Sequence, residues 1–313
     1  MTASLTGRAL PYALAAATAV FWSGNYVLGR VVIDEFPPVS LAFWRWLLAW
    51  AILMPFAWRP MRRAWPVIRR YWPRLTLLGL LSVPCYNTMV YVAFHTTSTI
   101  NASVLNSTMP LAIVILAWLL FRERLTAWQT AGVAISLGGV LWIVARGAPE
   151  TLLQLEVTPG DLWVIGAVLV YALYMVLLRL RPAGLGGLAF LGVIVTVGVA
   201  ALLPASLIEL AFTGPPHVTA ANAAIVAYMA VFASLLAYVF WNHATATIGA
   251  SRTGVFIHLI PVITTVLSLL FLDETLHWFH VVGMAAVLGG VVLVARGGPT
   301  PAAVRPAKDA RAL

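Results

Sequence analysis

Long apolar segments are the feature of this sequence that most constrains its fold. Ten such runs follow one another, at about 11–32, 38–58, 75–95, 100–120, 126–145, 161–180, 185–207, 221–243, 253–272 and 277–296. Each run has roughly the 20 residues that an α-helix needs to cross the hydrocarbon core of a bilayer. Only helices and closed barrels satisfy all their backbone groups there. We therefore predict an all-α integral membrane protein with ten transmembrane helices.

The composition excludes a soluble fold. Hydrophobic residues make up 62% of the 313 residues and charged residues only 9%, whereas soluble domains carry about 25% charged residues to cover their surface. The chain has 19 basic and 10 acidic residues, and we attribute this excess to membrane orientation rather than to nucleic-acid binding. Its single cysteine, Cys85, excludes an intramolecular disulfide.

The basic residues predict the orientation in the membrane. Six arginines crowd the loop after the second apolar run: Arg59, Arg62, Arg63, Arg69, Arg70 and Arg74. Loops rich in arginine and lysine stay on the cytoplasmic side, so alternation places both termini in the cytoplasm. The same alternation places Asp34, Asp161 and Glu274 on the opposite side. An even number of spans is required by this pattern.

An internal repeat divides the sequence into two halves. A shift of 151 positions aligns the fourth and fifth runs with the ninth and tenth, and it pairs Pro110 with Pro261, Gly132 with Gly283, and Leu137–Val140 with Leu288–Val291. Matched prolines and glycines in one ungapped frame are difficult to obtain by chance from apolar composition alone. We predict a first repeat over 1–150, a second over 151–300, and a cytoplasmic tail over 301–313. Each half holds five runs, so the second must insert inverted relative to the first.

Several motifs relate the chain to a known family. They are Phe21–Tyr26 in the first run, Phe43–Trp46 in the second, and the stretch from Ala102 through Pro110 to Thr126, which recurs in the second half. With these motifs the chain resembles the EamA family of the drug/metabolite transporter superfamily, from about Tyr12 to Arg296. The resemblance implies a secondary transporter of the bacterial cytoplasmic membrane. Such a carrier exports or exchanges small metabolites, often amino acids, through a central cavity by alternating access.

Helix breakers are the first candidates for a role in transport. Pro110 and Pro261 lie near the middle of the fourth and ninth runs, where a proline removes one backbone hydrogen bond. They are either a pair of hinges for alternating access or static kinks that improve packing. Gly138-Gly139 and Gly289-Gly290 would allow close contact between helices, for which packing is the favoured role.

Ionisable residues within the apolar runs are the second group. Arg45 lies between Trp44 and Trp46 in the second run, and it could attract a substrate carboxylate or pin a neighbouring helix. The resemblance favours the structural role. His258, three residues before Pro261, could couple protons, but a hydrogen bond from a lone histidine to a carbonyl is the simpler account.

Acidic residues are absent from the middle of the runs. Glu123 and Glu274 fall at the ends of the fourth and ninth runs, where we expect them to cap spans five and ten, with Thr126 as the N-cap in the first case. Their position argues against a sodium site or a proton relay built from carboxylates.

Polar and aromatic residues on the remaining runs are candidates for substrate contact. Together with Arg45 and His258 they are Trp22, Asn25, Tyr86, Asn87, Tyr91, Asn101, Asn106, Tyr171, Tyr174, Tyr238, Trp241 and Asn242. Amides and aromatics around a cavity suit a small amphipathic or zwitterionic solute, whereas phosphorylated solutes would need several buried cations. The competing role for each aromatic is packing or an interfacial belt.

The expected partners are therefore a small-molecule substrate and the lipid bilayer, with no nucleic acid, cofactor or metal, and a monomer is compatible with the pattern. A carrier of another small polar solute or drug is the alternative of the same class. An intramembrane enzyme acting on lipids would need a nucleophile and base or a metal set, and the runs contain no such cluster. A structural or regulatory subunit would leave the repeat unexplained.

Overall fold

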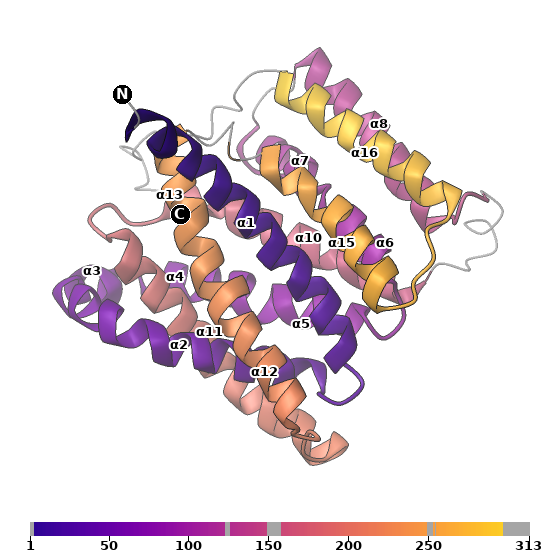
Figure 1. Ribbon diagram of the computed structural model, residues 1–313. Helices are drawn as coiled ribbons and strands as arrows, with labels where there is room; N and C mark the ends of the chain where they lie inside the picture. The colour runs from indigo at the N-terminus through magenta and orange to yellow at the C-terminus, as the bar shows by residue number, and fades with distance from the viewer. Residues whose placement is uncertain (1–2, 123–125, 149–157, 249–252, 254, 297–313) are drawn as a thin grey trace.

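The computed structural model describes residues 3–122, 126–148, 158–248, 253 and 255–296, and every regular element within them is a helix (Figure 1). The first half contains α1 (Ala3–Val32), α2 (Pro38–Arg63), α3 (Trp65–Arg70), α4 (Trp72–Leu80), η1 (Leu81–Cys85), α5 (Tyr86–Ala93), α6 (Thr99–Asn106), α7 (Met109–Phe121) and α8 (Ala127–Val144). The second half contains α10 (Pro159–Leu177), η2 (Leu178–Leu180), α11 (Gly187–Thr213), α12 (Ala220–Tyr228), η3 (Met229–Leu236), α13 (Ala237–Ile248), η4 (Val255–His258), α15 (Leu259–Phe271) and α16 (Trp278–Arg296). The all-helical prediction is confirmed.

The number of spans is supported only in part. Six helical segments are long and apolar enough to cross a bilayer, namely Pro38–Arg63, Trp72–Ala93, Ala127–Val144, Pro159–Leu180, Gly187–Thr213 and Ala220–Ala244. A seventh candidate is the pair α6 and α7, which are bent by 41° at their junction. Phe256–Phe271 and Trp278–Val294 are shorter apolar helices. Every predicted run coincides with a helix or a broken helix, while the count of ten spans stays a prediction.

Helices of the two halves pack against each other in pairs. The most extensive contacts join α8 to α16, α2 to α11, α1 to α13, α5 to α10 and α1 to α15, and α6 also contacts α15. Figure 1 shows α8 and α16 side by side at one edge of the bundle, separated from the central helices by α6, α7 and α15. The two halves therefore interleave.

Close packing of α8 on α16 depends on four glycines. A Cβ atom added to Gly132 would lie 2.5 Å from the carbonyl oxygen of Gly290, and one added to Gly290 would lie 2.5 Å from the oxygen of Gly132. Gly139 and Gly283 face each other in the same way, at 2.9 and 3.1 Å. The shift of 151 residues converts each of these contacts into the other. Gly138 and Gly289, by contrast, have no atom within 4 Å of an added Cβ, so only the second glycine of each predicted pair packs.

The shift of 151 residues also relates two residues that have a left-handed backbone conformation at helix ends. Arg122 ends α7 with φ 54°, and Asp273, which follows α15, has φ 51°. Left-handed residues that are not glycine are uncommon. They commonly terminate helices by turning the chain away from the axis.

Two acidic residues cap helices of the other half. Glu274 accepts hydrogen bonds from the backbone nitrogens of Thr99 (2.8 Å) and Ile100 (3.2 Å), at the start of α6. Glu209 of α11 likewise accepts bonds from the nitrogens of Val39 (3.0 Å) and Ser40 (2.7 Å), at the start of α2. A carboxylate suits a helix N-terminus because it meets free N–H groups and the positive end of the dipole.

The role expected for Glu274 therefore differs from the one observed. It caps α6 rather than span ten, since α16 begins only at Trp278 and the free N–H groups of α6 lie beside the carboxylate. Thr126 caps α8 as expected, in a capping box with Gln129. Glu123 lies outside the described residues.

The two prolines lie at helix starts. Pro110 is the second residue of α7, after a break at Ser107 and Thr108, and Pro261 is the third residue of α15, after the 3₁₀ turn η4. We expected a kink within one continuous helix. At Pro110 the structure has two separate helices instead, whereas at Pro261 the 3₁₀ turn η4 runs directly into α15. Proline is well tolerated in a first turn, where its missing N–H would have no partner within the helix.

We predict that Gly132→Ala lowers the stability of the protein whereas Gly138→Ala does not. The added methyl group at 132 meets the backbone oxygen of Gly290, so the helices must separate at a cost of about 1–3 kcal/mol. The methyl group at 138 meets nothing, and alanine raises helix propensity there. Thermal unfolding in detergent measures both variants, and equal midpoints would contradict the glycine contact.

Candidate functional site

Two π-helical segments flank one buried arginine. The segment η1, which contains Pro84, interrupts the third span, and η3 interrupts the eighth. A π-turn changes the register of the helix, and such turns are frequent at functional sites. Arg45 projects from α2 and is 5% exposed. Helix α2 contacts both segments, so the π-turns bring polar groups of both halves to this side chain.

Neutral polar groups hold the Arg45 guanidinium. Nη1 donates to Asn87 Oδ1 (3.0 Å) and to the Tyr91 hydroxyl (2.6 Å), and Nε donates to Ser234 Oγ (2.8 Å). The Trp46 ring lies against the same cation, with its centroid 5.4 Å from Cζ. Asn87 and Ser234 are themselves bound to the backbone of their own helices. The arginine is therefore fixed in orientation by both halves of the chain.

A cluster of aromatic rings forms a second group. The rings of Tyr86 and Tyr171 have centroids 4.7 Å apart, and those of Tyr171 and Tyr174 are 5.2 Å apart. The hydroxyls of Tyr171 and Tyr238 lie 3.2 Å apart, and Tyr86 donates to Asn106 Oδ1 at 3.2 Å. These residues come from α5, α6, α10 and α13. Four helices from both halves thus contribute to one cluster.

Two tryptophans extend this cluster. The rings of Trp22 and Trp241 are 5.3 Å apart, and Trp22 also contacts Tyr238 edge-on at 6.5 Å. Trp22 Nε1 donates to the carbonyl of Ala233, in η3, at 3.2 Å. The side chains of Tyr86 and Tyr171 are half-buried.

The structure brings most of the predicted substrate residues together. The first group extends toward the second through Tyr91, whose hydroxyl donates to Asn25 Oδ1 (3.4 Å), and Asn25 lies on the same helix as Trp22. The residues gathered in this way are Trp22, Asn25, Arg45, Tyr86, Asn87, Tyr91, Asn106, Tyr171, Tyr174, Tyr238 and Trp241.

Three predicted residues lie elsewhere. Asn101 bonds to Asp161, and Asn242 is exposed. His258 ends η4, and its Nδ1 is enclosed without a hydrogen-bond partner among the described residues, so the expected bond to a carbonyl is not made by that atom.

Asp161 is a buried carboxylate for which the charge pattern predicted only a position on the side opposite the cytoplasm. It is fully buried in the first turn of α10, where Thr97 Oγ1 donates to it and Asn101 Nδ2 lies 3.4 Å away. The sequence Pro159-Gly160-Asp161 is typical of a helix start and could have indicated this position. Its contacts tie α10 to the connection between α5 and α6.

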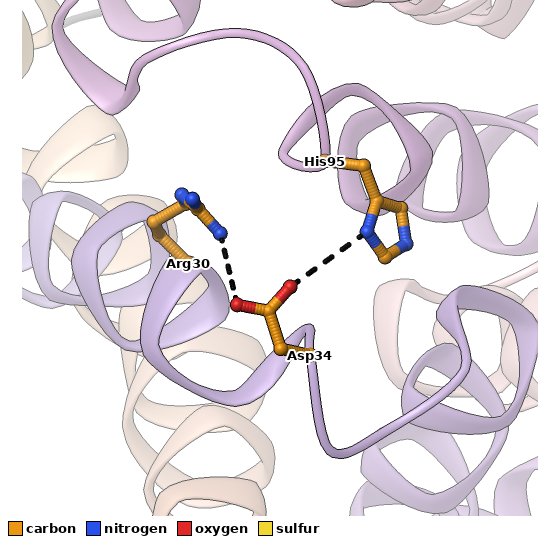
Figure 2. Close-up of polar contacts among 3 residues, drawn as sticks. All are labelled: Arg30, Asp34 and His95. Carbon is orange, nitrogen blue, oxygen red and sulfur yellow. Dashed lines mark ion pairs between the residues drawn. The ribbon is translucent and has the colours of Figure 1, made fainter.

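A cavity with charges of both signs lies at the ends of α1 and α5. Figure 2 shows Asp34 between Arg30 (3.5 Å) and His95 (4.0 Å). The cavity has a volume of about 490 Å³ and is lined by Arg30, Val31, Asp34, Phe94, His95, Thr96, Thr97, Ser98, Leu272 and Glu274. A neighbouring cavity of about 550 Å³ shares Thr96, Thr97, Ser98 and Glu274 with it. Because Asp34 is 72% exposed, these ion pairs contribute little to stability.

Among the described residues, few side chains at this site could bind a metal or a cofactor. Within the described part of the chain, no three histidine, cysteine or acidic side chains are close enough to hold a metal ion. What the cluster offers is hydrogen-bonding and aromatic surface around one cation. Such a site can bind a small solute and release it unchanged.

Known proteins resemble the chain along nearly its whole length. An uncharacterized transporter of Bacillus subtilis, YyaM, is 28% identical over 279 residues, which cover 88% of this chain and 90% of the relative. A probable terminal-alkyne amino-acid exporter of Streptantibioticus cattleyicolor is 24% identical, covering 89% of this chain and 91% of the relative. A solved crystal structure superposes with a TM-score of 0.59 and 20% identity, over 90% of this chain and 96% of that one, and shows the fold alone.

The family model gives the assignment. The model of the EamA-like transporter family matches twice, at residues 9–145 and at residues 158–296. Together the two matches span most of the 313 residues. The chain therefore belongs to the EamA-like transporter family.

Proposed function

We propose that this protein exports or exchanges small metabolites such as amino acids across the bacterial cytoplasmic membrane, by alternating access. The observation that carries the proposal is the convergence of aromatic and amide side chains from both halves on one buried region. One arginine among neutral groups suits a small amphipathic solute better than a polyanion. The name of the relative from Streptantibioticus cattleyicolor supports amino acids as the class.

The proposal includes an inverted arrangement of the two halves, 1–150 and 151–300, with ten spans, a cytoplasmic tail over 301–313 and both termini inside. The exchange of glycine contacts under the 151-residue shift supports it, as does the pairing of α1 with α13 and of α5 with α10. A two-fold relation between halves, with an axis in the membrane plane, produces contacts of this kind. In such carriers the halves rock about a site between them.

Pro110 and Pro261 are proposed as the hinges of this motion. Pro110 follows the break between α6 and α7, which directly adjoins Asn106, and Asn106 accepts a hydrogen bond from Tyr86 in the aromatic cluster. A change of bend at this point would therefore move a residue of the binding region. Pro261 follows the 3₁₀ turn η4, and His258 at the end of that turn keeps an unpartnered nitrogen available for a role in coupling.

Tyr171→Phe should reduce transport. The substitution removes the hydroxyl that lies 3.2 Å from Tyr238, a loss that corresponds to about a two- to tenfold lower rate if the bond shapes the site. Flux of labelled amino acids into proteoliposomes, with recovery of the unchanged solute, is the measurement. Tyr12→Phe, on a 41% exposed residue of α1, is the matched control. Wild-type flux in Tyr171→Phe would argue against the aromatic cluster as the site.

Cysteine labelling tests the inverted arrangement. In a Cys85→Ala background, Arg122→Cys and Asp273→Cys place single thiols on exposed residues that the 151-residue shift relates. A membrane-impermeant maleimide added to intact cells should label the cysteine at 273, and the cysteine at 122 only after permeabilisation, because five intervening spans reverse the side. Labelling of both from one side would overturn the arrangement.

Pro261→Ala should slow flux and leave the half-saturating concentration nearly unchanged. Alanine supplies the missing N–H and favours a continuous α-helix through η4, which would stiffen the junction of η4 with α15. Pro159→Ala, at the first residue of α10, is a control in an unbroken helix. If Pro261→Ala transports as fast as the wild type, the hinge role is wrong.

A further inference from the structure

Arg45 is a buried cation without a partner of opposite charge among the described residues. Its three hydrogen bonds go to a side-chain amide and two hydroxyls, which are neutral. The ion pairs in the described ranges are those of Asp34 with Arg30 and with His95. We infer that the guanidinium binds the carboxylate of the transported solute, an assignment that rests on the proposed function above.

The acidic side chains that the structure describes are engaged elsewhere. Asp34 lies beside Arg30, Glu35 accepts from Asn222, Asp161 from Thr97, Glu209 caps α2 and Glu274 caps α6, while Asp273 is exposed. None of them is within ion-pair distance of Arg45. Neutral dipoles satisfy individual N–H groups, but they do not cancel a net charge held away from water. A charge buried at membrane depth normally faces a counter-ion, backbone carbonyls or a water-filled path.

One nitrogen of Arg45 is free to bind a ligand. Nε and Nη1 are occupied, whereas Nη2 has no acceptor among the described residues. Nη2 is also not one of the fully enclosed polar atoms that lack a partner. It therefore borders accessible space, although the residue as a whole is only 5% exposed. A carboxylate reaching this space would receive up to two N–H donors from Nη2, in a charge-assisted bond.

The surroundings fit the rest of an amino acid. Tyr91 binds Arg45 on one side and Asn25 on the other, and Asn25 is three residues from Trp22 on α1. Trp22 in turn contacts the rings of Tyr238 and Trp241. An ammonium group is attracted to the face of an aromatic ring, and apolar side chains pack on aromatic rings. The carboxylate then lies at Arg45 and the amine and side chain lie among the rings.

An arginine that only holds neighbouring helices together would make the same three hydrogen bonds. The experiment must therefore separate this structural role from binding of a carboxylate. Purified protein is screened by thermal shift against the twenty amino acids and, in parallel, against their amides, at one chloride concentration, and a chloride titration without amino acid is run beside the screen. We expect at least one amino acid to raise the unfolding temperature. Its amide should raise the unfolding temperature only at about tenfold or higher concentration, because the amide lacks the charge-assisted bond. Equal effects of acid and amide, or no effect of any acid, would overturn the assignment. A response to chloride alone would also overturn it, by showing an inorganic anion at the site.

Two arginine-to-glutamine substitutions complete the test. Arg45→Gln should lose the distinction between acid and amide, whereas Arg30→Gln, on the half-buried arginine of Figure 2, should keep it. The comparison of acid with amide uses the unaltered protein, so it stands even if Arg45→Gln fails to fold. Proteoliposome flux separates the two proposals. Amides carried as fast as acids would refute the carboxylate site and leave the carrier intact, whereas no flux of any solute would refute the carrier.

Discussion

The requirement that every backbone polar group find a partner away from water governs this structure. In hydrocarbon an unpaired N–H or carbonyl costs several kcal/mol, by order of magnitude, so each place where a helix starts or breaks needs a local solution. At the start of α2 and of α6 the solution is a carboxylate from the other half, Glu209 of α11 or Glu274 of the connection between α15 and α16. After the break between α6 and α7, and after the 3₁₀ turn η4, proline occupies the first turn of the helix that follows and removes one of the donors.

A second constraint is that the hydrophobic effect does not drive helices together within a bilayer, because lipid tails are as apolar as the side chains. Helices in a bilayer associate through close van der Waals contact and a few polar bonds, which favours small residues at their interfaces. The contact of α8 with α16 follows this rule, because Gly132, Gly139, Gly283 and Gly290 let the two backbones approach. That pair stands at the edge of the bundle in Figure 1, away from α2, the helix that carries Arg45. It is suited to hold the halves together while other pairs move.

Local patterns in the sequence predicted local structure well. The apolar runs predicted the positions of the helices, and Thr126 with Gln129 predicted a helix start that the structure confirms. Partners far apart in the sequence were not predictable. Nothing near Glu274 indicates that it caps a helix 175 residues earlier, and nothing near Ser234 indicates that it binds Arg45. The π-turns were missed because their pattern of apolar residues is that of any buried helix.

The placement of Arg45 explains how one charge can serve a carrier built from two similar halves. Its partners Asn87 and Tyr91 belong to α5 in the first half, and Ser234 belongs to η3 in the second. If the halves rock against each other, these bonds cannot all keep their lengths, so the guanidinium must exchange partners during each cycle. A solute carboxylate bound to the free nitrogen would compensate the charge while neutral partners change. The bound solute would then lower the barrier to rocking, and the empty carrier would have to move an uncompensated cation. A carrier with that property exchanges one solute for another more readily than it returns empty.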